Sequence, residues 1–393
     1  MNTYQTSWRY GAWMVFLWAI MIIGAYATYL RFRYGLGVTN LSDTYPWGLW
    51  IAVDVMGGVA LAAGAFCMAL TVHLLRIETY RSVVRPAILT GLIGYLSAII
   101  GILFDLGQPH RIWHVMISWQ PNSVMFEVAW CVMLYTTVLI LEFAPTLLER
   151  LGGSRLASFL HSLTVPLVIA GVILSTLHQS SLGGLLLIAP DHVHPLWYSP
   201  LLPLLFLLSA IAVAPFVVAV ESILSSWALG RGLERDIVQG LGRAGAYLLV
   251  LYGAVRLGDL LLRGAGPALF GERSLFLWAE LALMIFLPLI LLSFSVIRRS
   301  PAGLLVTGLL VASGVVLYRY NAVVLAKIVP EGVAYFPNWV EFAITAGIVA
   351  WGLWLYTLAV RYLPIFPPEA QEQPTFVLRL ERRVPLRAAS RFG

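Results

Sequence analysis

The chain has 393 residues, of which 60% are hydrophobic and only 11% are charged, and its mean hydropathy is +0.85. A soluble domain carries about a quarter charged residues, so this composition excludes a water-soluble globule and indicates a membrane protein. Its two cysteines, Cys67 and Cys131, are too few for a disulfide scaffold, a zinc finger or a four-thiolate iron–sulfur site. Metal redox chemistry would therefore have to reside in a partner. The net charge of +6 suits anionic lipid headgroups better than nucleic acid, because the excess arginines are scattered over short loops.

Apolar runs of about 20 residues predict ten transmembrane helices. Runs this long and this poor in charge favour helices over a β-barrel, whose strands would alternate every second residue. The predicted fold class is therefore an all-α polytopic membrane protein. In chain order the expected spans are residues 11–30, 47–75, 86–104, 122–143, 158–178, 201–224, 243–262, 275–297, 302–318 and 339–363.

An even number of spans places both termini on one side of the membrane, and the arginines indicate which side. Most basic residues outside the spans lie on the side of the termini, so the positive-inside rule predicts that both termini are cytoplasmic. The tail of residues 364–393 is proline-rich and basic and has no apolar period, so we interpret it as a cytoplasmic extension.

Two acids in the first half of the chain match two acids in the second half. Asp105 and Asp259 close the third and seventh expected spans, and Glu127 and Glu280 open the fourth and eighth at nearly the same offset. This spacing predicts two related four-helix bundles with the first and last helices at the periphery. The predicted units are a membrane domain of residues 1–363, with one bundle at 47–178 and the other at 201–325.

Polar side chains inside the spans are the best site markers, because a charge in lipid is costly and usually faces a cavity. Most of them fall near the outward ends of the spans, and four share a similar expected depth: Asp54, Asp105, Glu127 and His178. Each of these side chains could instead form a structural ion pair within the protein or extend to the lipid headgroups. His178 closes the expected fifth span ahead of QSSLGG, which could fold over a polar ligand, or it could be a plain helix-end histidine. Together the four predict a proton-handling site near the outward face.

Haem ligation is a competing interpretation. A b-type haem in a membrane bundle needs two axial histidines on facing helices at one depth, and on the cytoplasmic side only His73 and His161 qualify. Nothing in the surrounding sequence marks either as a ligand, and we predict no haem or metal in this chain.

Several segments, in order along the chain, resemble one known family. They are YPWGLWIAVD, NSVMFEVAW, ILEFAPTLLERL, LHQSSLGG followed by HPLW, YFPNWVEF and RYLPIFPPE, between about residues 35 and 368. The chain thereby resembles the NrfD-like family, also called the polysulfide reductase membrane-subunit family. The similarity is greatest to its ten-helix branch, found as the membrane subunit of respiratory nickel–iron hydrogenases and of sulfite-reduction-associated and menaquinone-reductase complexes.

The resemblance implies a quinone, usually menaquinone, bound near the outward face of a prokaryotic cytoplasmic membrane. It also implies an extracytoplasmic four-cluster ferredoxin-like subunit that exchanges electrons with that quinone, and a separate catalytic subunit. The quinone-binding and proton-handling residues would be Asp54, Asp105, Glu127 and His178. The candidate proton path would include Glu142, Glu221, Arg256, Asp259 and Glu280.

Quinone reduction takes two electrons and two protons, so the protein must supply an apolar slot, hydrogen-bonding groups and a proton route. We expect His178 to donate to one quinone oxygen and Asp54 or Glu127 to reprotonate it. Two other functions stay open. A secondary transporter would carry its charges near the midplane and would work alone. A purely structural anchor for a redox complex would tolerate the loss of His178 and Glu127.

Overall fold

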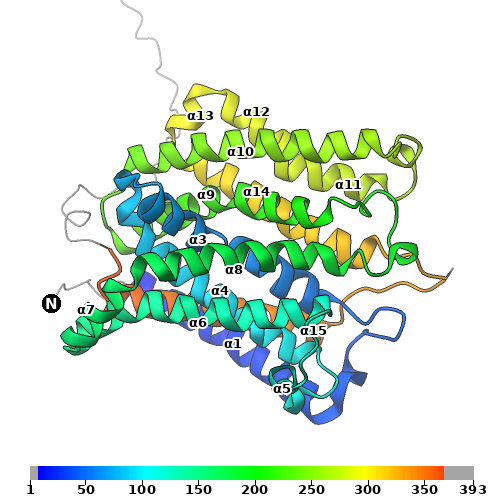
Figure 1. Cartoon of the computed structure of the whole chain (residues 1–393), viewed down its shortest axis with the longest axis horizontal. Helices are drawn as coiled ribbons and strands as arrows, with labels where there is room; N and C mark the ends of the chain where they lie inside the picture. The colour runs from blue at the N-terminus through cyan, green and yellow to red at the C-terminus, as the bar shows by residue number, and fades with distance from the viewer. Residues whose placement is uncertain (1–7, 331, 367–393) are drawn as a thin grey trace, which may run out of the picture.

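The computed structural model describes residues 8–330 and 332–366, and within them ten helical spans are long and apolar enough to cross a membrane. The long helices run side by side, and the connections between them gather at two ends of the molecule (Figure 1). The predicted all-α polytopic architecture is confirmed. The predicted tail lies outside the described residues apart from its first three positions, 364–366.

Following the predicted division, we call the second to fifth spans the first bundle and the sixth to ninth spans the second bundle. The second span is a series of short helical pieces, namely a π-helical segment Trp50–Gly57, α2 (Gly58–Leu61), α3 (Gly64–Ala69) and a second π-helical segment Leu70–Leu74. The third to fifth spans are a 3-10 turn Glu78–Val83 leading into α4 (Val84–Asp105), then α6 (Val124–Leu151) and α8 (Thr164–Leu185). α4 packs against the second span and α6, and α6 packs against α8.

The second bundle contains the sixth to ninth spans. They are α9 (Leu202–Leu229), α10 (Arg235–Leu262), α11 (Ser274–Leu281) continued by the π-helical Ala282–Phe286 and α12 (Leu287–Ser293), and α14 (Pro301–Tyr320) continued by the π-helical Asn321–Leu325. α9 packs against α10 and α14 on one side and against α8 and the second span on the other. It therefore joins the two bundles.

The first and last spans form a pair beside the first bundle. α1 (Trp8–Tyr34) packs along α15 (Trp339–Tyr362), and α15 also contacts α4. The two helices meet at glycines, because a Cβ added to Gly24 would lie 2.8 Å from Cα of Gly347. The division into two four-helix bundles with peripheral first and last helices stays a prediction.

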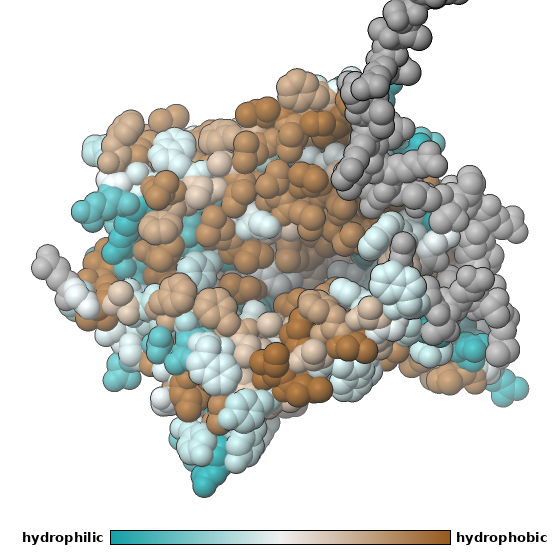
Figure 2. All heavy atoms as spheres, turned by 180° about the vertical axis from the view of Figure 1, so that it is seen from behind, coloured by the Kyte–Doolittle hydropathy of each residue, from teal (hydrophilic) through white to brown (hydrophobic). Residues whose placement is uncertain are grey.

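Short helices occupy the two ends. α5 (His114–Ile117) lies at the predicted outward end, and α7 (Ser154–Ser162) and α13 (Ser295–Arg299) lie at the predicted cytoplasmic end, where α1 begins (Figure 1). Apolar side chains cover the middle of the face seen in Figure 2, and hydrophilic ones lie mostly toward its ends. Together with the ten spans, this surface describes a multi-pass integral membrane protein.

The fifth span differs from the prediction. The sequence predicts an end at His178, but α8 runs to Leu185, so His178 lies inside the helix about 10 Å from its end. The expectation that the residues after His178 form a loop is wrong. The reason is packing: a Cβ added to Gly183 would lie 2.6 Å from the carbonyl carbon of Leu202, so this glycine lets α8 meet the start of α9 backbone to backbone.

Candidate functional site

A fully buried histidine and tyrosine meet between α4 and α8. The hydroxyl of Tyr95 lies 2.8 Å from Nδ1 of His178, whose Nε2 has no hydrogen-bond partner among the residues that the structure describes. If the phenol donates to Nδ1, the neutral imidazole carries its proton on Nε2 and presents an N–H donor there. His178 is therefore a positioned and unused donor inside the bundle.

Further polar side chains continue from this pair toward the predicted cytoplasmic end. The ring of Tyr135 lies 4.6 Å from that of Tyr95, centroid to centroid, and Ser175 faces both hydroxyls without forming a well-aligned hydrogen bond. A Cβ added to Gly171 would lie 3.4 Å from Tyr135 and 3.9 Å from a carboxylate oxygen of Glu142. These side chains form a polar series in the first bundle, and we call it the first-bundle series: His178, Tyr95, Ser175, Tyr135 and Glu142.

Glu127 lies at the predicted outward end of α6, which packs against α8. Its carboxylate accepts a hydrogen bond of 2.6 Å from the hydroxyl of Ser181, which is one helical turn from His178 on α8. The side chain of Glu127 is otherwise exposed at the start of α6. Glu127 and Glu142 are about 22 Å apart along α6, so carboxylates flank the buried pair on both sides.

Asp54 and Asp105 belong to a different group, on the side of α4 that faces α1 and α15. Asp54 is buried in the π-helical turn of the second span and accepts a hydrogen bond of 2.7 Å from Thr345. Asp105 ends α4 close to Arg31, whose guanidinium donates to the carbonyl oxygens of residues 104 and 106. Within the described residues, no hydrogen bond joins these two acids to His178 or Glu127. The four predicted quinone-side residues therefore do not share one hydrogen-bonded cluster: Glu127 and His178 lie along α6 and α8, whereas Asp54 contacts α15 and Asp105 contacts α1.

Glu221 lies at the junction of the two bundles, toward the predicted cytoplasmic end. The hydroxyl of Tyr356 on α15 donates to it at 2.8 Å, and its second carboxylate oxygen, which lies near Thr90, forms no well-aligned hydrogen bond within the described part of the chain. No hydrogen bond in the described part of the chain links Glu221 to Glu142. The two acids that the sequence places on a single path therefore sit in separate clusters.

The second bundle holds a buried ion pair. Arg256 of α10 donates to Glu280 of α11 at 3.2 Å, and both side chains are almost fully buried. Glu280 also accepts hydrogen bonds from Trp197 at 2.9 Å and from Asn321 at 2.7 Å. A second buried arginine, Arg319, stacks on a phenylalanine ring and forms no ion pair among the described residues.

These contacts tie the connection between α8 and α9 to the second bundle. Arg256 donates to the carbonyl oxygen of Leu196 at 3.2 Å, and Asp259 accepts a hydrogen bond of 2.6 Å from Ser199. Asp259 also forms a salt bridge with Arg263. The three predicted path residues of this bundle therefore anchor residues 196–199 in the structure.

One of the two acid pairs matched by spacing, Glu127 and Glu280, makes corresponding contacts. Glu127, at the start of the fourth span, bonds to Ser181 of the fifth, and Glu280, near the start of the eighth, bonds to Asn321 of the ninth. The same pair of helices is joined in each bundle. This correspondence supports the proposal that the two bundles are repeats.

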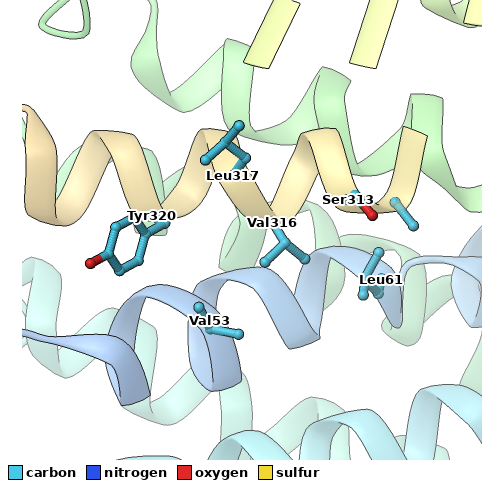
Figure 3. Close-up of a pocket in the computed structure, with 7 residues that line it drawn as sticks. Val53, Leu61, Ser313, Val316, Leu317 and Tyr320 are labelled. Carbon is cyan, nitrogen blue, oxygen red and sulfur yellow. The ribbon is translucent and has the colours of Figure 1, made fainter. Parts of the chain in front are cut away.

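An apolar groove of about 410 Å³ lies between the second span and α14. Figure 3 shows Val53 and Leu61 of the second span on the side of Val316 of α14, and Leu317 and Tyr320 of α14 also line the groove. Asp54 follows Val53 but bonds toward α15, so it lies on another side of the same π-helical turn. A groove lined in this way could hold an isoprenoid tail.

Sequence reasoning missed the aromatic and hydroxyl members of the first-bundle series, Tyr95, Tyr135 and Ser175. A signal for two of them was present. Tyr135 follows Glu127 by eight residues and precedes Glu142 by seven, and Ser175 precedes His178 by three, spacings that place side chains near one face of a helix. Tyr95 carries no such signal, because only the packing of α4 against α8 brings it to the histidine.

The two histidines weighed as haem ligands lie in polar surroundings near the predicted cytoplasmic end. His161 is exposed on α7, with Nε2 3.4 Å from a carboxylate oxygen of Glu149. His73 lies in the last π-helical turn of the second span. In the part of the chain that the structure describes, no three histidine, cysteine or acidic side chains group as metal ligands.

Comparison with known proteins gives consistent matches over most of the chain. Residues 37–331 match the family model described as polysulphide reductase, NrfD. The chain is 35% identical to the probable Ni/Fe-hydrogenase 2 b-type cytochrome subunit of Escherichia coli (strain K12), over 87% of this chain and 89% of the relative. It is 31% identical to the menaquinone reductase integral membrane subunit of Nitratidesulfovibrio vulgaris (92% and 93%), and 25% identical to a selenate reductase subunit of Mesobacillus selenatarsenatis (91% and 94%).

Proposed function

Because the chain belongs to the NrfD polysulphide reductase family, we propose that it is the quinone-binding membrane subunit of a respiratory oxidoreductase complex. It exchanges electrons between an extracytoplasmic iron–sulfur subunit of the four-cluster ferredoxin type and menaquinone or menaquinol. Two relatives are named as subunits of a hydrogenase and of a menaquinone reductase, which supports this proposal. In the same proposal the chain lies in a prokaryotic cytoplasmic membrane with both termini in the cytoplasm.

The observation that carries the proposal is the unpartnered Nε2 of His178. Among the described residues this atom has no partner, and leaving a fully buried polar atom in that state is costly, which favours a ligand that accepts its hydrogen bond. A bound quinone would supply two-electron, two-proton redox chemistry. His178 would donate from Nε2 to one ring oxygen, and Tyr95 would hold the imidazole in the tautomer that can donate.

Protons would reach His178 through the first bundle. Glu127 is exposed at the predicted outward end and contacts Ser181, one turn from the histidine, so it can take protons from the outer side. The series from Tyr95 to Glu142 leads in the opposite direction, toward the cytoplasm. Transfer along that series would couple quinone turnover to proton movement across the membrane. Any proton path through the second bundle would be separate from this one. Its candidate residues are Arg256, Asp259 and Glu280, whose hydrogen bonds anchor the α8–α9 connection.

Asp54 and Asp105 have a distinct place in the proposal. Asp54 accepts a hydrogen bond from Thr345 of α15, and Asp105 lies beside Arg31 of α1. The groove between the second span and α14 would hold the isoprenoid tail, and Asp54 would supply a second carboxyl on the outward side. Asp54 and Asp105 would then contact the quinone as it enters, while His178 would donate to an oxygen of the bound quinone ring.

Glu127→Gln tests the proposal. Glutamine can still accept the Ser181 hydrogen bond, but it cannot carry a proton, so quinone-linked electron transfer should be lost while the complex assembles normally. The measurement is reduction of a soluble menaquinone analogue by the purified complex with its own electron donor. Glu149→Gln on the same helix is the control, because Glu149 sits at the cytoplasmic end in an exposed pair with Arg85. Normal turnover in Glu127→Gln would refute the assignment.

Purification of the native complex separates this function from the alternatives. Co-purification of an iron–sulfur subunit and extraction of a quinone support the redox function, whereas a chain that works alone with neither is a transporter. A structural anchor would keep its partners but would tolerate His178→Ala without loss of activity. The name of the Escherichia coli relative includes a b-type cytochrome. We propose that this chain binds no haem, and the dithionite-reduced minus oxidised spectrum of the isolated chain should lack a haem band.

A further inference from the structure

A basic pocket lies at the predicted cytoplasmic end of the second bundle, away from the residues considered above. It has a volume of about 260 Å³ and is lined by Gln239 and Arg243 of α10 and by Arg298 and Arg299 of α13. α13 connects α12 to α14, so the pocket opens between transmembrane helices at the level where they leave the membrane.

The three arginines of the pocket carry uncompensated charge. Arg298 is held in place by hydrogen bonds from Nη1 to the carbonyl oxygens of Leu292 and Ser293, at 2.9 and 3.2 Å. Within residues 8–330 and 332–366, none of the three forms an ion pair with a carboxylate. Three guanidinium groups therefore share one pocket without an acidic partner among the described residues.

Apolar side chains lead from this pocket along the membrane-facing surface. Tyr247 and Val250 follow Arg243 at four and seven positions on α10, so they continue the same helix face, and they are 78% and 55% exposed. Val296 of α13 is also 78% exposed. A ligand with an anionic head and an apolar chain fits this combination, because the head meets the arginines while the chain lies on the helix surface.

We propose that this pocket binds the headgroup of a phospholipid that carries two phosphodiester groups. Guanidinium groups bind phosphate oxygens in a bidentate manner, and three of them match two phosphates better than one. Basic pockets between transmembrane helices on the cytoplasmic side are suited to such headgroups. The site is independent of quinone binding, since its residues take no part in the first-bundle series.

Lipid binding to the full chain with its partner subunits tests this inference. Complexes in phosphatidylcholine nanodiscs are titrated with cardiolipin, and bound lipid is counted by native mass spectrometry. The Arg243→Gln, Arg299→Gln double variant should bind cardiolipin about 25-fold more weakly, because each arginine near an anionic lipid contributes about fivefold. Arg150→Gln, Arg155→Gln is the matched control, with the same loss of charge at the same end of the molecule, and it should bind as the parent does.

Other outcomes would overturn the inference. Equal loss in the control would show that general surface charge attracts the lipid. If the complex retained phosphatidylcholine as well as it retains cardiolipin, the net negative charge of the headgroup would have no role in binding. Displacement of cardiolipin by equimolar inorganic phosphate would show that the pocket takes free phosphate and not a lipid. An Arg243→Lys, Arg299→Lys variant is the control for misfolding. It keeps both positive charges, so it should bind cardiolipin more tightly than the glutamine variant does.

Discussion

The hydroxyl of Tyr95 and Nδ1 of His178 lie 2.8 Å apart, with both side chains fully buried between α4 and α8. The tyrosine occupies one ring nitrogen, so only Nε2 is left to meet a ligand. Tyr95 is in this sense a positioning residue: it touches no ligand in our proposal but decides which nitrogen of His178 is the donor.

Removal of that hydroxyl should therefore impair turnover more than stability. We expect Tyr95→Phe to cost about 1 kcal/mol in the free energy of unfolding, the typical contribution of one hydrogen bond, and to slow quinone-linked electron transfer by about 100-fold. Electron-transfer rates across a pH series are the measurement, and the pH profile should shift because the histidine tautomer is no longer held. Tyr247→Phe, in an exposed position on α10, is the control. An unchanged rate and profile in Tyr95→Phe would show that the tyrosine has only a packing role.

The positions of the spans could be predicted because bilayer thickness sets the length of an apolar run. The ends of α8 could not be predicted in this way. Apart from Leu182, residues 179–184 are glycine, serine or glutamine, a composition typical of loops, and their helical state depends on the close contact of Gly183 with Leu202 of α9. That contact joins segments from the two different bundles, so no local pattern reports it.

Depth along a span could also be estimated, but the direction in which a side chain points could not. The sequence predicts one shared site for Asp54 and His178, because both lie in the outward parts of their spans. In the structure Asp54 bonds to Thr345 on α15 and His178 bonds to Tyr95, on different sides of α4. The orientation of each helix about its axis is set by packing, and packing depends on all ten spans together.

The contact between α8 and α9 gives a sharp test of the fold. Gly183→Ala should destabilise the protein by about 1–3 kcal/mol, because the new methyl group would meet the backbone of Leu202, which cannot move aside cheaply. Gly184→Ala is the matched control, since its methyl group would lie 3.7 Å from Val124, an ordinary contact. Thermal unfolding in detergent compares the two. Equal melting temperatures would mean that the helices do not meet as described.

The buried ion pair of the second bundle should respond unequally to loss of its two members. Glu280→Gln leaves Arg256 and Arg319 buried without a counter-charge, and we expect a loss of about 3–5 kcal/mol. Arg256→Met leaves Glu280 with its donors Trp197 and Asn321 and with Arg319 as the remaining positive charge, so the loss should be smaller. Thermal stability of the two variants decides the order. If Glu280→Gln is as stable as the parent but moves fewer protons per electron, the anchoring role is wrong and a proton path through Glu280 is supported.

Acid should weaken the connection between α8 and α9 through His194, which lies outside the spans. Burial, together with the positive charge of Arg273, lowers the pKa of His194 below its usual 6.5, so the folded protein favours the neutral ring. Its Nδ1 accepts a hydrogen bond of 3.3 Å from the backbone N–H of Leu196, which a protonated ring could not do.

Below pH 6.5 the unfolded chain gains a proton first, so this contribution to stability is present at neutral pH and is lost as the pH falls through the lowered pKa. Melting temperatures between pH 7.5 and about 5 should therefore fall less steeply for His194→Asn than for the parent, whereas His192→Asn, exposed in the same connection, should follow the parent. Identical slopes for all three proteins would show that His194 does not govern the acid response.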